Sequence, residues 1–180
     1  MSKPINPSAT IHVRSALRPG DIGAVIRLHG LVYGAEYQFD YTFEGYVAEG
    51  LVQFLKAHDP GRDCLWLAEE EDQLVGCIAI VHRTNTEAQL RWFLLHPDFR
   101  GQGLGRRLLN QALDFCRAAG YQTVLLWTVR GLQAATHLYR SAGFRITEAH
   151  TASLWGRTIT EERYDLSLAA SEHYSLRSTL

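Results

Sequence analysis

At the centre of the chain stands LLHPDFRGQGLGRR, residues 94–107, the stretch that decides the fold. It joins the end of an apolar strand to a glycine-rich turn and then to the start of a helix. Glycines at alternate positions, Gly101, Gly103 and Gly105, let the backbone approach an anion closely. The free N–H groups and the dipole of the first helical turn point at that anion. The stretch therefore predicts a binding site for a diphosphate group, with nearby arginines adding positive charge.

The helix after the turn is identified by its apolar side chains. They recur at helical spacing on one face, and Gly120 then stands where a helix typically ends. This stripe consists of Leu104, Leu108, Ala112, Cys116 and Ala119. The phosphate loop of nucleotide hydrolases needs Gly-Lys-Ser/Thr, and the dinucleotide fingerprint needs another glycine spacing and an acidic residue about 20 residues later. Neither of these two loops matches the sequence.

The turn resembles the pyrophosphate motif of the GNAT superfamily of acyl-CoA N-acyltransferases, Arg/Gln-x-x-Gly-x-Gly/Ala, through Arg100, Gly103 and Gly105. The segments on either side resemble the same family. Upstream, Leu95-His96-Pro97 is similar to the end of its bulged strand, and downstream Tyr139 to Phe144 is similar to its Tyr-x-x-x-Gly-Phe helix. The resemblance implies an acetyltransferase that uses acetyl-CoA.

The resemblance runs from Val13 to Leu168 and is closest to the acetyltransferase domain that is fused to MarR-type regulators. The segments that carry this finer likeness are Tyr33–Tyr37, Leu126–Thr128 and Trp155-Gly156. The DNA-binding half of such fusions has no counterpart in this sequence. We therefore expect one GNAT acetyltransferase domain over residues 1–168, followed by a poorly ordered tail over residues 169–180.

The resemblance implies an α/β (α+β) GNAT fold, in which a mixed, mostly antiparallel sheet of about seven strands is splayed at its middle strands and carries four helices. Residue periodicity gives a matching order of elements. Strands are predicted at residues 11–14, 64–69, 74–82, 88–95, 123–129, 144–149 and 164–168. Helices are predicted at residues 22–33, 43–55, 104–119 and 132–142.

Composition excludes several classes of function. The chain has 180 residues, of which 46% are hydrophobic and 21% charged, and its net charge is −1. Such a chain has no general attraction to nucleic acid or to anionic membranes, and its longest apolar run, Leu74–Val81, is far shorter than a membrane span. We expect a cytoplasmic protein. Its three cysteines and eight histidines lack metal-ligand spacing, so we expect free thiols and no metal.

The resemblance makes Tyr139 the general acid beside the cofactor sulfur. The helical stripe around this residue favours a packing role, but the Gly-Phe cap after it favours the catalytic one. Gln89 stands where several members of the family place a catalytic glutamate, and an amide cannot accept a proton but can orient a water or the acceptor. Glu87 lies two residues upstream on the same strand face, so it is a candidate base, as are Glu36 and Glu44.

The cofactor residues also follow from the resemblance. Backbone N–H groups around Leu94 and Leu95 are expected to bind the pantetheine amides and to polarise the thioester carbonyl. Leu132 stands where the family often has an asparagine that contacts the cofactor, and Thr128 is a partial substitute for it. The expected diphosphate site comprises Arg100, Gly101, Gln102, Gly103, Leu104, Gly105 and Arg106.

An acidic and aromatic segment covers the expected acceptor side. Residues 28–55 contain no Lys or Arg. We therefore predict a small cationic amine with apolar bulk, bound by Tyr33, Glu36, Tyr37 and Glu44. The alternative is that the aromatic rings only pack the two helices onto the sheet while the acids face water.

Three functions stay open at this point. The favoured one is direct transfer of an acetyl group from acetyl-CoA to the primary amine of a small molecule, without nucleic-acid or membrane partners. The second is a non-catalytic sensor or interaction module that binds acyl-CoA, because Gln89 and Leu132 both depart from the family pattern. The third is acetylation of protein lysines or N-termini. A homodimer is compatible with each.

Overall fold

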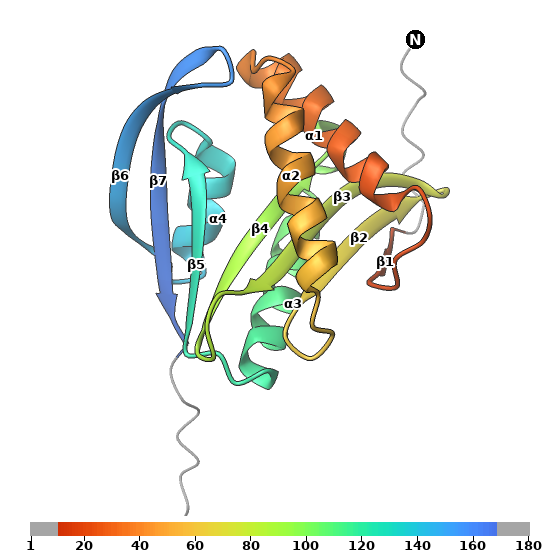
Figure 1. Cartoon of the computed structure of the whole chain (residues 1–180), viewed down its shortest axis with the longest axis vertical. Coiled ribbons are helices and arrows are strands. Elements are labelled where there is room, and N and C mark those ends of the chain that lie inside the picture. Colours follow the sequence, from red (N-terminus) through yellow and green to blue (C-terminus); the bar gives the residue numbers. More distant parts are fainter. Residues whose placement is uncertain (1–10, 169–180) are drawn as a thin grey trace, which may run out of the picture.

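The computed structural model describes residues 11–168, and its fold is the predicted one. These residues form one open sheet of seven strands in the order β1-β2-β3-β4-β5-β7-β6, with four α-helices (Figure 1). The elements are β1 (His12–Arg14), α1 (Asp21–Tyr37), α2 (Thr42–Ala57), β2 (Cys64–Glu70), β3 (Gln73–His82), β4 (Glu87–Leu95), a 3₁₀ turn (Pro97–Phe99), α3 (Leu104–Ala118), β5 (Thr123–Val129), α4 (Gln133–Ser141), β6 (Arg145–Leu154) and β7 (Arg157–Ser167).

The sheet opens between its two middle strands, as the resemblance implied. β4 and β5 are parallel and pair only where Glu87–Gln89 lies beside Thr123–Leu125. Beyond Gln89 the two strands separate, which Figure 1 shows as a V between the lime and cyan arrows. All other neighbouring strands are antiparallel. The splay leaves backbone groups of both strands without a partner strand, at the place where ligands can reach them.

A bulge in β4 reverses the side of the sheet to which alternate side chains of this strand point. The pairing with β3 shifts between Cys77 and Ala79, and Trp92 has a positive φ of 48°. Before the bulge, Leu90 packs on the α3 side of the sheet, whereas Trp92 after it packs on the side of α1 and α2. Arg91 and Trp92 consequently lie on the same side, although regular strand residues alternate.

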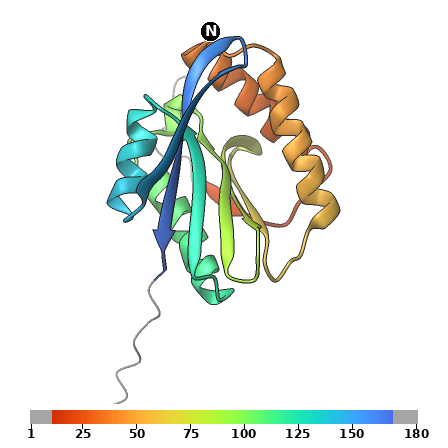
Figure 2. The same cartoon turned by 60° about the vertical axis from the view of Figure 1, so that its left-hand side comes forward.

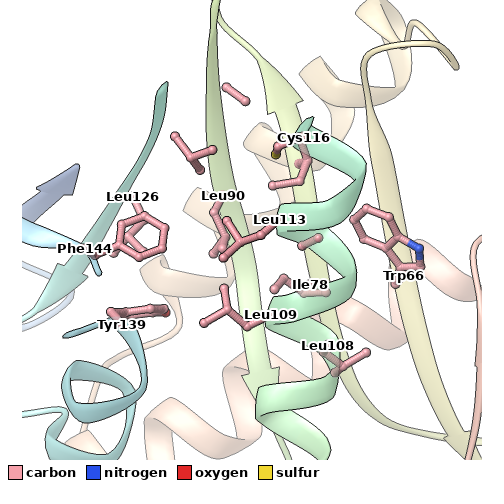
Figure 3. Packing of buried hydrophobic residues seen from close by; sticks show 14 of the residues in the cluster. Trp66, Ile78, Leu90, Leu108, Leu109, Leu113, Cys116, Leu126, Tyr139 and Phe144 are labelled. Carbon is pink, nitrogen blue, oxygen red and sulfur yellow. The ribbon is translucent and has the colours of Figure 1, made fainter. Parts of the chain in front are cut away.

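The helices cover both faces of the sheet, α1 and α2 on one and α3 and α4 on the other (Figure 2). Each face has its own apolar core. The core on the α3 side contains the stripe predicted from the sequence, and Figure 3 shows Tyr139 and Phe144 beside Leu126 at one end of it and Trp66 at the other. Tyr139, from α4, is thus anchored by packing as well as placed near the splay.

The last two strands are longer than predicted. The sequence indicated residues 144–149 and 164–168, but β6 and β7 form a hairpin over Arg145–Leu154 and Arg157–Ser167. Most of β6 is exposed and polar, so it lacks the alternation that reveals a half-buried strand. Trp155 and Gly156 form the turn, both with positive φ. The tail predicted at 169–180 lies outside the described residues.

Candidate active site

The glycine-rich turn lines a groove beside the N-terminus of α3. Gly101 and Gly103 have φ values of 75° and 82°, a conformation that side-chain-bearing residues rarely adopt, and Gly103 is the N-cap of α3. Gly101, Gly103, Gly105 and Arg106 all line the groove. Leu104 is buried in the core behind the turn, and the exposed Gln102 donates to the Asp98 carbonyl at 3.0 Å, which shapes the turn. First-turn N–H groups and the helix dipole make this end of the groove attractive to an anion.

Arg100 lines the same groove but already has a protein partner. Its Nη1 donates to both carboxylate oxygens of Glu36 at 2.9 and 3.0 Å, and its Nε donates to the Leu95 carbonyl at 3.1 Å. The ion pair joins the end of α1 to the turn. Glu36, predicted to bind the acceptor, is therefore held beside the glycine-rich turn.

The long wall of the groove is built by β4 and α4. Leu94 and Leu95 line it from the splayed end of β4, and Leu132 and Leu138 line it from α4 and its N-cap. This wall is mostly apolar, as a pantetheine arm requires. Thr128, predicted to contact the cofactor, lines the neighbouring cavity instead.

A second cavity lies between β4, β5 and the helices α1 and α2, and we call it the acceptor cavity. Tyr33 and Phe93 line both the groove and the acceptor cavity, so the two spaces meet there. Gln89 and Thr128 line the acceptor cavity from the two splayed strands. Tyr37, also predicted to bind the acceptor, lines the groove rather than this cavity.

Tyr139 stands at the junction of the two spaces. Leu138 lines the groove, whereas the next residue, Tyr139, lines the acceptor cavity and is only 4% exposed. Burial raises the pKa of its phenol well above the ordinary value, and the nearby hydroxyls of Tyr33 and Tyr164 raise it further. The phenol thus stays protonated throughout the physiological pH range and is available as a proton donor.

The carboxylates divide into those inside the acceptor cavity and those outside it. Glu87 lies at the start of β4, 3.8 Å from Arg163, and Glu44 lies over Gly30 of α1; neither lines the cavity. Glu161 does line it, from β7, and its carboxylate lies 3.0 Å from Nε2 of His150 in β6. Glu161 was not among the residues predicted from the sequence, because β7 was expected to begin at residue 164. The alternation of Ile159, Glu161 and Arg163 in one strand register is the signal that could have revealed it.

The tip of the β6–β7 hairpin lies against the loop between α1 and α2 (Figure 1), and Trp155 at this tip lines the acceptor cavity. The Asp40 N–H donates to the Trp155 carbonyl at 3.1 Å. The Trp155 ring lies 4.8 Å from Phe43 and 5.2 Å from Tyr46, centre to centre, and all three line the cavity. Part of the predicted aromatic wall thus lines this cavity, and part of it, such as the buried Phe39, packs the helices as the alternative expected.

His29 is a buried polar residue of the acceptor cavity that sequence analysis did not select. Its Nδ1 bonds to the Val25 carbonyl at 2.8 Å, and its ring stacks on Tyr33. Burial lowers its pKa to about 4. His29 is therefore uncharged at neutral pH and contributes a polar but neutral surface.

A family comparison agrees with this geometry. The model of the "Acetyltransferase (GNAT) family" matches residues 31–144, from the second half of α1 to the end of α4. The chain belongs to the GNAT acetyltransferase family. The matched residues include the glycine-rich turn, the splayed strands and Tyr139, so the family predicted from the sequence is confirmed.

Similar proteins support the same membership. Human N-acetyltransferase 8B is 35% identical over 101 residues, 53% of this chain and 44% of that protein, and zebrafish (Danio rerio) N-acetylaspartate synthetase is 32% identical over 121 residues, 66% of this chain and 43% of that protein. This GNAT chain thus matches less than half the length of these two relatives.

Solved structures share the GNAT fold at low identity. An acetyltransferase of Streptococcus agalactiae has a TM-score of 0.73 at 19% identity and covers 88% of this chain and 98% of that chain. The structure of yncA from Salmonella typhimurium, described with its cofactor acetyl-CoA, has a TM-score of 0.67 at 20% identity and covers 92% of this chain and 96% of that chain.

Residues 11–168 contain no cluster of three or more His, Cys, Asp or Glu side chains that could hold a metal ion. No helix in the same range has the length and apolar character to cross a membrane.

Proposed function

We propose that this GNAT protein is an acetyl-CoA-dependent N-acetyltransferase that acts on the primary amine of a small molecule. The observation that carries this proposal is the junction at α4, where Leu138 lines the groove for a cofactor and Tyr139 lines the acceptor cavity. A donor and an acceptor can therefore be bound together. Direct transfer in a ternary complex follows, because Cys77 and Cys116 are buried and Cys64 lies away from both spaces.

The groove has the features that coenzyme A requires. A Cβ on Gly101 or Gly103 would have no atom within 4 Å, so the backbone at this turn is open to an incoming group. The first-turn N–H groups of α3 and the exposed Arg106 provide donors and positive charge for a diphosphate. Acetyl-CoA supplies an acetyl group activated as a thioester, which an amine can attack with release of the CoA thiol.

Tyr139 is the proton donor in this proposal. Its buried phenol can donate to the departing sulfur, and the apolar surroundings that raise its pKa also raise the proton affinity of a thiolate. Phe93 and Phe144 pack around its ring at 6.1 and 5.9 Å between centroids and hold it in place. Water is excluded from the donor by the same packing.

Glu161 is the group that we assign to the amine. Glu161 lines the acceptor cavity with its carboxylate beside His150, and we assign to it the binding of an ammonium and the uptake of its proton. Gln89 lies on the facing strand and can orient the amine or a water without accepting a proton. Glu87, Glu36 and Glu44, the base candidates named from the sequence, have no comparable position.

Release of free CoA thiol from acetyl-CoA, measured over a panel of amines, amino acids and short peptides, tests this function. Acceptor-dependent release that falls sharply in Tyr139→Phe supports it. Tight binding of acetyl-CoA without release for any acceptor would favour the sensor instead. Release only with peptides would favour a protein acetyltransferase.

The finer expectations from the sequence remain predictions. They are the kinship to acetyltransferase domains fused to MarR-type regulators, the cytoplasmic location, the homodimer and the lack of nucleic-acid partners. Purification with analysis of mass and bound nucleic acid addresses the last two directly.

A further inference from the structure

Arg91 is a basic residue of the acceptor cavity that the proposed chemistry does not use. It precedes the β4 bulge, lines the cavity and is half-buried. Its guanidinium carbon lies 4.7 Å from the centre of the Trp92 ring. A Cβ on Gly50 of α2 would lie 2.8 Å from its Nη2, so the absence of a side chain at Gly50 leaves the space that the guanidinium fills.

No acid neutralises this arginine. Within residues 11–168 the guanidinium of Arg91 has no ion-pair or hydrogen-bond partner, whereas the similarly placed Arg100 and Arg163 bond to Glu36 and Asp165. A half-buried guanidinium without a protein partner is free to bind an anionic group of a ligand. The indole N–H of the neighbouring Trp92 is also the one buried side-chain nitrogen or oxygen without a partner in the described residues. This corner of the site is rich in donors and poor in acceptors.

The cavity carries the opposite charge on another strand. Glu161 comes from β7, and Arg91 comes from β4, on the other side of β5. Phe43, Tyr46 and Trp155 form aromatic walls of the same cavity. His29 is neutral there because burial lowers its pKa to about 4. The cavity thus combines one cationic group, one anionic group and an apolar surface.

We infer that the acceptor is an amino acid with a free carboxylate and an apolar or aromatic side chain. Its amine binds at Glu161 and Gln89, its carboxylate binds the guanidinium of Arg91, and its side chain lies against the aromatic walls. This inference rests on the proposed function and specifies its acceptor. It departs from the cationic amine expected from the sequence, because Glu36 and Glu44 lie outside the acceptor cavity.

The test compares amino acids with their decarboxylated counterparts. L-Phenylalanine and L-leucine are each paired with the amine that lacks only the carboxylate, phenethylamine and isopentylamine, and kcat/KM is measured for the wild type and for Arg91→Gln. Because a site built for a charged group rejects an analogue that lacks it, the wild type is expected to prefer the amino acids by about a hundredfold.

In Arg91→Gln the ratio of kcat/KM between amino acid and amine is expected to fall by about tenfold or more, mainly through a higher KM for the amino acid. Arg83→Gln removes the same charge from an exposed loop and serves as the matched control, with an unchanged ratio. Equal preference for both members of each pair in the wild type, or an unchanged ratio in Arg91→Gln, overturns the inference.

A binding measurement separates this inference from the proposed function. 3-Phenylpropionate carries the ring and the carboxylate without an amine, so its binding needs no turnover. Titration calorimetry in the presence of CoA is expected to give a dissociation constant that rises about tenfold or more in Arg91→Gln. If no acceptor causes release of CoA, the proposed catalysis is wrong, but weaker binding of 3-phenylpropionate by Arg91→Gln still supports a carboxylate site. If the wild type and Arg91→Gln bind 3-phenylpropionate equally well, only the role of Arg91 is contradicted.

Discussion

The carboxylate of Glu36 receives two hydrogen bonds from the guanidinium of Arg100, at 2.9 and 3.0 Å. This ion pair joins the C-terminal turn of α1 to the glycine-rich turn before α3. α1 therefore contributes to the cofactor groove as well as to the acceptor cavity. A charge that the sequence assigned to the acceptor thus acts on the arginine of the diphosphate motif.

Glu36→Gln is expected to change the affinity for acetyl-CoA and to leave the acceptor KM unchanged. Loss of a negative charge beside Arg100 favours a polyanionic ligand, so the dissociation constant of acetyl-CoA should fall about two- to fivefold at low salt and less at high salt. The lost ion pair is half-exposed and contributes at most about 1 kcal/mol to stability. Calorimetric titration checks the affinity, and a raised acceptor KM would restore Glu36 to the acceptor side.

Tyr139→Phe is expected to lower kcat by about a hundredfold or more, because the proton donor is removed while the ring is kept. The KM values for acetyl-CoA and acceptor should change little. The phenyl ring still packs against Phe93 and Phe144, so the melting temperature reports that the fold is intact. A kcat within threefold of the wild type would show that the phenol takes no part in proton transfer.

Glu161→Gln is expected to lower kcat/KM by about a hundredfold at neutral pH, because no carboxylate then takes the proton of the ammonium. The variant should recover as pH rises toward the pKa of the acceptor amine, by about tenfold per pH unit, since free amine becomes abundant. Glu44→Gln removes an exposed carboxylate from α2 and is the control. Parallel pH profiles for Glu161→Gln and the wild type would refute the assignment.

Gly156→Ala is expected to loosen the hairpin tip that lines the acceptor cavity. The position has a φ of 76°, and a Cβ would lie 2.8 Å from the Asp40 carboxylate, which is held by the Thr42 N–H. We expect about 1–2 kcal/mol of destabilisation and a higher acceptor KM. Gly20 also has a positive φ, but a Cβ added there would have no atom within 4 Å. Gly20→Ala therefore measures the cost of the backbone strain alone. Equal acceptor KM values in the two variants would exclude a role of the hairpin tip in acceptor binding.

Arg14 is expected to make stability depend on pH. It is buried and bonds to Asp21 at 2.7 Å and to Glu69 at 2.9 Å, which lowers the pKa of both carboxyl groups. The two carboxylates stabilise the fold fully at pH values above their pKa in the unfolded chain, about 4. This stabilisation is lost as the pH falls through their lower pKa values in the folded protein. Arg14→Met should lower the free energy of unfolding by about 3 kcal/mol at pH 7 and by clearly less near pH 2. Urea unfolding at both pH values checks this, and an equal cost at both would contradict it.

Much of the fold could be predicted because its elements have strong local signals. The stripe from Leu104 to Cys116 lies on the α3 core, and the hairpin turn at Glu71 and Asp72, both with positive φ, separates β2 from β3 as the acidic cluster indicated. The splay of β4 from β5 came from the family resemblance and not from periodicity. No local pattern marks where two parallel strands separate.

The candidate site was harder to predict because it depends on which face a residue occupies. Glu36 and Glu44 share an acidic segment in the sequence, yet the ends of α1 and α2 carry them away from the acceptor cavity. Glu161 lines the cavity because the β6–β7 hairpin is longer than predicted, whereas Arg91 shares the strand face of Gln89 upstream of the bulge. The order of charged residues in the sequence does not show which of them the fold brings to the cavity.

The bulge at Trp92 divides β4 into two segments, to which the proposed function gives separate roles. Upstream of it Gln89 and Arg91 face the acceptor cavity, and downstream of it Leu94 and Leu95 line the cofactor groove. Selectivity for the acceptor can therefore diverge through substitutions before the bulge, while use of the shared donor is preserved after it. Deletion of one residue at the bulge would reverse this arrangement, because every later side chain would turn to the opposite face. Laboratory evolution of this protein toward new acceptors would therefore keep the length of β4 and vary the residues of its first half.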